Sequence, residues 1–110
     1  MNVLEELIMQ IIIDSGDVRY HAYEALTLAN EGKFEEARES IKRANEAMEK
    51  AHEAQTSVLF KEANGEKVEI SALFVHSQDH LMTAISEKNL IAQLIEMRKS
   101  IQDLIEAKNN

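Results

Sequence analysis

No proline occurs anywhere in the 110 residues, and this absence constrains the fold more than any other feature. A proline inside a helix costs ~3 kcal/mol, so a chain without one can form long, uninterrupted helices. The glycines are Gly16, Gly32 and Gly65. Gly32 and Gly65 lie in the polar stretches 31–33 and 63–67, where we expect helices to end, whereas Gly16 lies inside a helical pattern. The sequence therefore predicts an all-α chain of three helices.

The expected helices cover roughly residues 4–30, 34–62 and 69–108 of a single domain, 1–110. In the first two segments, apolar and small residues recur at alternating steps of three and four, which is the helical period. The first segment carries Leu4, Leu7, Ile8, Ile11, Ser15, Val18, Ala22, Ala25 and Ala29. The second has a narrow coiled-coil seam made of Ala37, Ile41, Ala44, Met48, Ala51, Gln55 and Val58.

The third segment changes its pattern halfway along. Its C-terminal half has one apolar side, which we expect to be the inner face: Leu90, Ile91, Leu94, Met97, Ile101, Leu104 and Ile105. In the N-terminal half the same side is polar and carries His76, Asp79, His80, Thr83 and Glu87. The apolar residues there fall on the other side, as an expected outer face or docking patch: Phe74, Val75, Leu81, Met82 and Ile85. A single three-helix subunit would place the polar row inside and leave the apolar residues exposed, so we expect self-association.

Composition limits the kinds of partner. Twelve Lys and Arg against twenty Asp and Glu give a net charge of −8, which disfavours binding to nucleic acid or anionic lipid. The chain has no cysteine, so disulfides, thiolate nucleophiles and thiolate metal sites are excluded. The first residues lack the basic start of a signal peptide, and no apolar run approaches the ~20 residues that span a bilayer. We expect a soluble, cytoplasmic protein, without membrane insertion, that binds proteins or small molecules.

The polar row of the third segment concentrates groups that can perform chemistry. His76 and His80 lie one helical turn apart, and Asp79 follows His76 by three residues. A neutral imidazole can act as a nucleophile, a base or a metal ligand, and His at i and i+4 is half of a zinc site. Spacing alone leaves three readings open: a metal site, covalent or acid–base catalysis, and structural histidines. His21 and His52 lie among polar neighbours, where surface or packing roles are expected.

Residues 75–83, VHSQDHLMT, resemble the V-H-A-Q-D-H-L-M-T signature of the lactose/cellobiose-type enzyme IIA component of the bacterial phosphoenolpyruvate sugar phosphotransferase system. Ser77, where the signature has alanine, is the one departure. The resemblance extends over nearly the whole chain. Residues 12–16 (IIDSG), Arg19, 22–26 (AYEAL) and 32–34 (GKF) are similar to the family's first helix and turn, and 51–56 (AHEAQT) to its second helix.

The resemblance implies an up-down-up three-helix bundle assembled as a coiled-coil-like homotrimer. It implies that His76 accepts a phosphoryl group from the phosphocarrier protein HPr. His76 would pass this group to a cysteine of the cognate IIB component during uptake of a β-linked disaccharide. By the same resemblance, Asp79 lies at the trimer axis and helps to hold Mg²⁺ or another divalent cation, while Gln78 and His80 position or hydrogen-bond the phosphoryl group.

Physical chemistry is compatible with these roles. The three glycines lie far apart, so no glycine-rich phosphate loop exists, and a protein donor is favoured over ATP. Three Asp79 carboxylates brought together by symmetry would take up protons or bind a hard cation. The alternatives are a metal-binding helical bundle, in the form of a hydrolase using His76, Asp79 and His80, and a passive coiled-coil interaction module. The hydrolase needs further ligands, and the only other histidines are His21 and His52.

Overall fold

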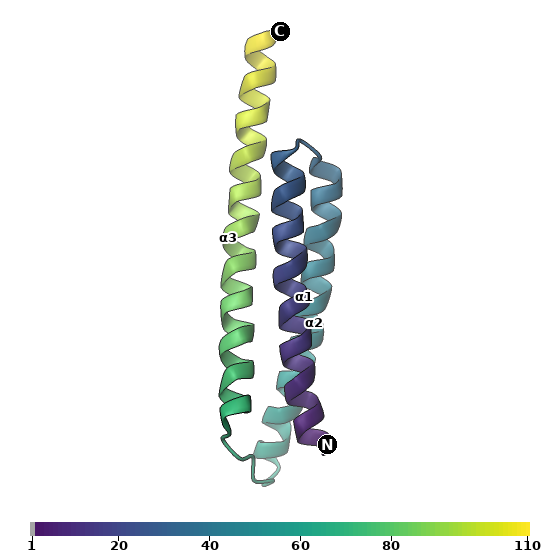
Figure 1. Cartoon of the computed structure of the whole chain (residues 1–110), viewed down its shortest axis with the longest axis vertical. Helices are drawn as coiled ribbons and strands as arrows, with labels where there is room; N and C mark the ends of the chain where they lie inside the picture. The colour runs from purple at the N-terminus through teal and green to yellow at the C-terminus, as the bar shows by residue number, and fades with distance from the viewer. Residues whose placement is uncertain (1) are drawn as a thin grey trace.

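The computed structural model describes residues 2–110, which form three long helices joined by two short connections. The helices are α1 (Val3–Asn30), α2 (Phe34–Ala63) and α3 (Ala72–Asn109). They run up, down and up, side by side along the long axis of the molecule (Figure 1). The predicted all-α class is confirmed, and the expected bounds of α1 and α2 agree to within one residue.

Local chemistry explains where the helices begin and end. Gly32 and Gly65 follow the ends of α1 and α2 with φ of +81° and +89°, a left-handed conformation that glycine adopts without strain. α3 begins three residues later than expected, because Ser71 caps it and its Oγ accepts a hydrogen bond from the backbone N–H of Phe74 at 3.1 Å. Gly16 lies inside α1, as expected.

α1 is the central helix and packs against both others, whereas α2 and α3 make few contacts with each other. The core consists of small clusters along α1 rather than one thick layer. Near the N-terminal end of α1, Ile11 packs with Ala51 and Leu81; near its middle, Val18 packs with Ala47 and Ala84. The many buried alanines allow the helix backbones to approach closely. The predicted inward faces of α1 and α2 are confirmed.

The predicted faces of α3 are wrong for a single chain. Leu81 is fully buried and Ile85 packs against the same cluster, so these two residues do not belong to an outer face. In contrast, most of the predicted inner face is exposed: Leu90, Leu94, Met97, Ile101, Leu104 and Ile105. Only Ile91 of that set is buried. The face that meets α1 is instead centred on Ser77, Leu81 and Ala84.

This difference has two causes: the apolar side of α3 faces away from α1 and α2, and α3 is the longest helix. With 38 residues it is longer than α1 and α2, with 28 and 30, and its C-terminal turns project beyond the connection between them (Figure 1). The exposed apolar set is not confined to those turns: Leu90, Leu94 and Met97 lie level with the start of α2, where Ile95 packs beside Phe34, and they are exposed because they face away from α1 and α2. We call this set the open stripe of α3: Leu90, Leu94, Met97, Ile101 and Leu104.

The molecule is a rod with extents of 65 × 21 × 17 Å. Between residues 2 and 110, none of the helices combines the length and the apolar character that crossing a membrane requires.

Candidate functional site

The polar row predicted from the sequence lies on the side of α3 that this chain leaves open. His76, Asp79 and Thr83 are exposed, while His80 and Glu87 are half-buried against α1. The expectation that the row faces inward is therefore wrong within one chain. Its members follow the same three-and-four spacing as the open stripe, so the row and the stripe form one continuous side of α3.

His76 and His80 lie together as the sequence predicts. Their rings are nearly parallel, with an interplanar angle of 10° and centroids 5.7 Å apart. A group bonded to a ring nitrogen of His76 would therefore extend beside the ring of His80. His76 is the more exposed of the two and is the one accessible to a partner.

Arg19 of α1 contacts His80, the half-buried histidine of this pair. Its Nη1 donates to Nδ1 of His80 at 3.0 Å, its Nη2 donates to Oγ1 of Thr83 at 2.9 Å, and its Nε donates to the carboxylate of Glu87. Sequence reasoning gave Arg19 no role, because a single charged residue on an amphipathic helix is usually a solvated one. The available signal was its place within the resemblance, one turn after Gly16.

The surroundings of His80 favour its neutral form. Burial lowers the pKa of His80 below the ordinary value of 6.5, and the positive charge of Arg19 acts in the same direction, as does His76. The nearby carboxylates of Asp79 and Glu87 oppose this effect but do not reverse it. At neutral pH His80 is therefore an uncharged imidazole with one N–H and one lone pair.

Asp79 presents an exposed carboxylate on the open side of α3, and among residues 2–110 this carboxylate takes part in no hydrogen bond or ion pair. Its oxygens suit a hard cation such as Mg²⁺. Within the described part of one chain, no three His, Asp or Glu side chains come together as a metal site. Any metal at Asp79 would therefore need ligands from outside the described part of one chain.

Gln78 does not join the two histidines. Its side chain faces α2, where Oε1 accepts a hydrogen bond from Nε2 of Gln55 at 2.6 Å. Gln78 is a half-buried link between α2 and the start of α3. In this arrangement the amide of Gln78 contacts Gln55 rather than His76.

The remaining histidines lie away from the pair. His21 is half-buried on α1, with Nδ1 3.3 Å from a carboxylate oxygen of Glu24, and His52 is exposed on α2. Both positions agree with the surface or packing roles expected for them.

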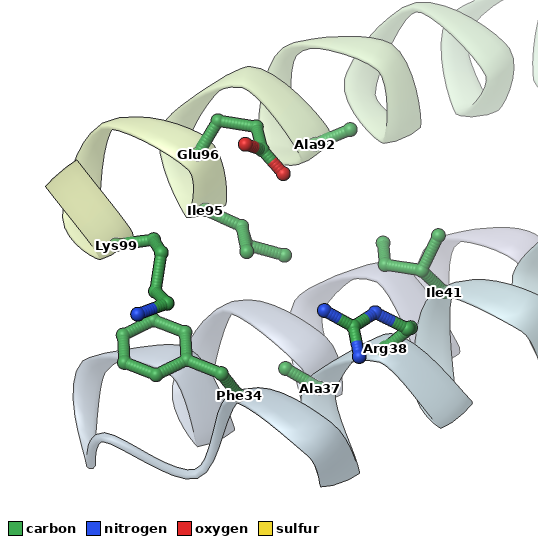
Figure 2. Close-up of a pocket in the computed structure, with 8 residues that line it drawn as sticks. All are labelled: Phe34, Ala37, Arg38, Ile41, Ala92, Ile95, Glu96 and Lys99. Carbon is green, nitrogen blue, oxygen red and sulfur yellow. The ribbon is translucent and has the colours of Figure 1, made fainter.

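A groove of about 150 Å³ opens between the start of α2 and the distal half of α3 (Figure 2). Phe34 and Ile41 of α2 face Ile95 of α3 across it, and Lys99 lies over the ring of Phe34. The groove lies nineteen residues along α3 from His76, about 30 Å at the helical rise. Its lining contains no histidine, so the histidine pair remains the candidate site.

Comparison with known proteins identifies the family of the chain. The sequence model of the family described as "PTS system, Lactose/Cellobiose specific IIA subunit" matches residues 6–99. The lichenan-specific phosphotransferase enzyme IIA component of Bacillus subtilis (strain 168) is 43% identical over 100 residues, 91% of each chain. The N,N'-diacetylchitobiose-specific EIIA component of Escherichia coli (strain K12) is 38% identical over 99 residues, 90% of this chain and 85% of that one.

Solved structures give the same result. The cellobiose-specific enzyme IIA from Bacillus anthracis superposes with a TM-score of 0.89 at 45% identity, covering 94% of each chain. The IIA(Chitobiose) component of Escherichia coli, solved in complex with HPr, superposes with a TM-score of 0.80 at 36% identity, covering 93% of this chain and 99% of that one. The chain therefore belongs to the lactose/cellobiose-specific IIA family of the sugar phosphotransferase system and is one of its phosphotransferase components.

Proposed function

We propose that this IIA component is a cytoplasmic phosphoryl carrier that takes its phosphoryl group from HPr onto His76. It then delivers the group to a cysteine of the cognate IIB component, which phosphorylates a β-linked disaccharide during uptake. The observation that carries this proposal is the exposed imidazole of His76, stacked on a neutral His80 that Arg19 holds from α1. The solved complex of a related IIA component with HPr supports HPr as the partner.

The transfer needs little from the protein besides positioning. A lone pair on a ring nitrogen of His76 attacks phosphorus, the bond between phosphorus and its donor atom on HPr breaks, and the electron pair leaves with HPr. The second nitrogen of His76 keeps its proton, so no external base is required. The neutral His80 can donate one hydrogen bond to the phosphoryl oxygens without placing a second nucleophile on the open side.

The open stripe supports assembly into a homotrimer. Exposed leucine, isoleucine and methionine side chains at helical spacing are typical of a helix face that packs against another helix. Asp79 follows the same register, so three α3 helices packed through the stripe would bring their Asp79 carboxylates together. These carboxylates would hold Mg²⁺ or another divalent cation, whose charge offsets their mutual repulsion. With His80, Gln78 would position the phosphoryl group on His76.

Phosphorylation of single-histidine variants tests the proposal. The protein is incubated with phosphoenolpyruvate, enzyme I and HPr, and the bound phosphate is tested for stability in acid and in base. We expect one phosphate per chain that is labile in acid and stable in base, as for a phosphorus–nitrogen bond. His76→Ala should abolish labelling without changing the circular dichroism spectrum, and His80→Ala should slow it.

His52→Ala is the matched control, because His52 is an exposed histidine on another helix. It should label at the wild-type rate. Full labelling of His76→Ala, or a label that maps to His21 or His52, would contradict the proposal.

A further inference from the structure

Arg19 makes more contacts across the interface between α1 and α3 than the proposed function requires. Its guanidinium bridges His80, Thr83 and Glu87, which occupy two successive turns of α3. The side chain is 29% exposed, so these contacts lie partly out of water. Glu87 and Thr83 orient the guanidinium, and this leaves Nη1 directed at one nitrogen of His80.

The chemistry of this contact determines where the proton of His80 lies. A guanidinium has five N–H donors and no acceptor, so Nδ1 of His80 must accept with its lone pair. A neutral imidazole carries a single ring proton. That proton must therefore lie on Nε2 for as long as Arg19 occupies Nδ1.

The other edge of the ring faces a part of α1 without a side chain. A Cβ added at Gly16 would lie 3.9 Å from Nε2 of His80, an ordinary contact distance. Among residues 2–110, Nε2 has no hydrogen-bond partner. α1 thus supplies a strong donor to one nitrogen of His80 and leaves the other nitrogen free to donate.

We propose that Arg19 is a positioning residue that fixes His80 as the Nε2–H tautomer, so that His80 offers a donor rather than a lone pair to a phosphoryl group on His76. This inference rests on the proposed function, because the phosphoryl group is the acceptor. The two rings are nearly parallel with centroids 5.7 Å apart, so a phosphoryl group on His76 lies close to His80. An N–H there stabilises the phosphoryl oxygens, whereas a lone pair would repel them.

The tautomer can be read directly in the unphosphorylated protein. Two-bond ¹H–¹⁵N NMR spectra of ¹⁵N-labelled protein, recorded at a pH where His80 is neutral, distinguish a protonated from an unprotonated ring nitrogen. In the wild type we expect unprotonated Nδ1 and protonated Nε2. Arg19→Met keeps the length of the side chain and removes the donors, so the spectrum should show a mixture of tautomers. Arg19→Lys retains a donor and should restore the wild-type pattern.

Phosphoryl transfer provides the second readout. Arg19→Met should lower the rate of labelling at saturating HPr by roughly tenfold, the value of one hydrogen bond to a charged group, while the HPr concentration for half-maximal rate is unchanged. Arg19→Lys should recover most of the rate. Arg38→Met, which removes an exposed arginine of α2, is the control and should leave the His80 spectrum unchanged.

A protonated Nδ1 in the wild type, an unchanged spectrum in Arg19→Met, or an unchanged transfer rate despite an altered spectrum would each overturn the role of Arg19. Because the tautomer is read before phosphorylation, these failures leave phosphoryl acceptance by His76 intact. Labelling of a residue other than His76 would instead overturn the proposed function, and the tautomer spectrum would be unaffected.

Discussion

Glu24 of α1 forms a side-chain hydrogen bond to α2. Its Oε1 accepts a hydrogen bond from the hydroxyl of Ser40, a buried residue of α2, at 2.8 Å, and Nδ1 of His21 lies 3.3 Å from the same oxygen. These contacts, with Ser40 contributing most, lower the pKa of Glu24 below its ordinary value of 4.5. A folded-state pKa below the unfolded value means that the carboxylate stabilises the fold at neutral pH.

We predict that Ser40→Ala lowers the free energy of unfolding near pH 7 by about 1 kcal/mol, because it removes one partly exposed hydrogen bond to a carboxylate. The difference from wild type should shrink as pH falls below 4.5 and through the folded-state pKa, where Glu24 becomes protonated in both proteins. Urea unfolding over a pH series, at one protein concentration, measures this.

Ser57→Ala is the control for that series. Ser57 is an exposed serine of α2 whose hydroxyl donates only to the backbone carbonyl of Glu53, so its removal should change stability little. A Ser40→Ala difference that is constant from neutral to acid pH would contradict the role assigned to Glu24.

Among the helices, α3 differs from the other two because it has a second apolar side that no helix of this chain covers. α1 and α2 bury their periodic faces against each other, whereas the open stripe of α3 has no partner within the chain. Leu94 lies near the middle of this stripe and is 46% exposed. Its neighbour Gln93 is also exposed but points to another side of the helix.

We predict that Leu94→Glu shifts the protein from trimer to monomer, because it places a charge in an apolar contact between subunits. Sedimentation velocity at micromolar concentration measures the change. Gln93→Glu adds the same charge one residue earlier, outside the stripe, and should remain trimeric. Equal sedimentation of the two variants would show that the stripe is not the contact surface.

How far the sequence predicts this molecule depends on the helix in question. For α1 and α2, the absence of proline, the turn glycines and a strict period predict both bounds and buried faces. For α3 the helical period is present, but apolar residues occur on two sides of the helix. The larger apolar set lies on the side that this chain leaves exposed. The inward face, with Ser77 and Ala84, is small and weakly apolar, so composition alone could not identify it.

The candidate site was predictable in the same uneven way. Adjacent turns of one helix must bring His76 and His80 together, so their pairing follows from spacing. The contact of Arg19 with His80 joins residues 61 positions apart and depends on how α1 is rotated against α3. The link between Gln78 and Gln55 likewise depends on packing between helices, and spacing along α3 could not predict it.

As a whole, the molecule is too thin to be a self-sufficient globule. Its radius of gyration is 17.8 Å, whereas a compact chain of this length has about 13 Å. A rod of this kind gains most from partners that lie alongside it, and the open stripe is the surface suited to them. In a trimer assembled through this stripe, the Asp79 carboxylates are the like charges that meet.

We predict that Asp79→Leu remains trimeric in the presence of a chelator, because an apolar group in place of three clustered carboxylates removes their repulsion. Chelator should weaken association of the wild type. Asp103→Leu is the control, since it removes the same charge from the opposite side of α3. An Asp79→Leu variant that is monomeric or unfolded, with a wild type indifferent to chelator, would contradict the axial position of Asp79.

Native mass spectrometry of the protein after incubation with phosphoenolpyruvate, enzyme I and HPr reports assembly and phosphoryl content in one spectrum. We predict a particle of three chains that carries three phosphoryl groups, and for His76→Ala a particle of three chains that carries none. A wild-type particle without phosphoryl groups, or a His76→Ala particle that still carries them, would contradict the claim that this molecule carries phosphate on His76.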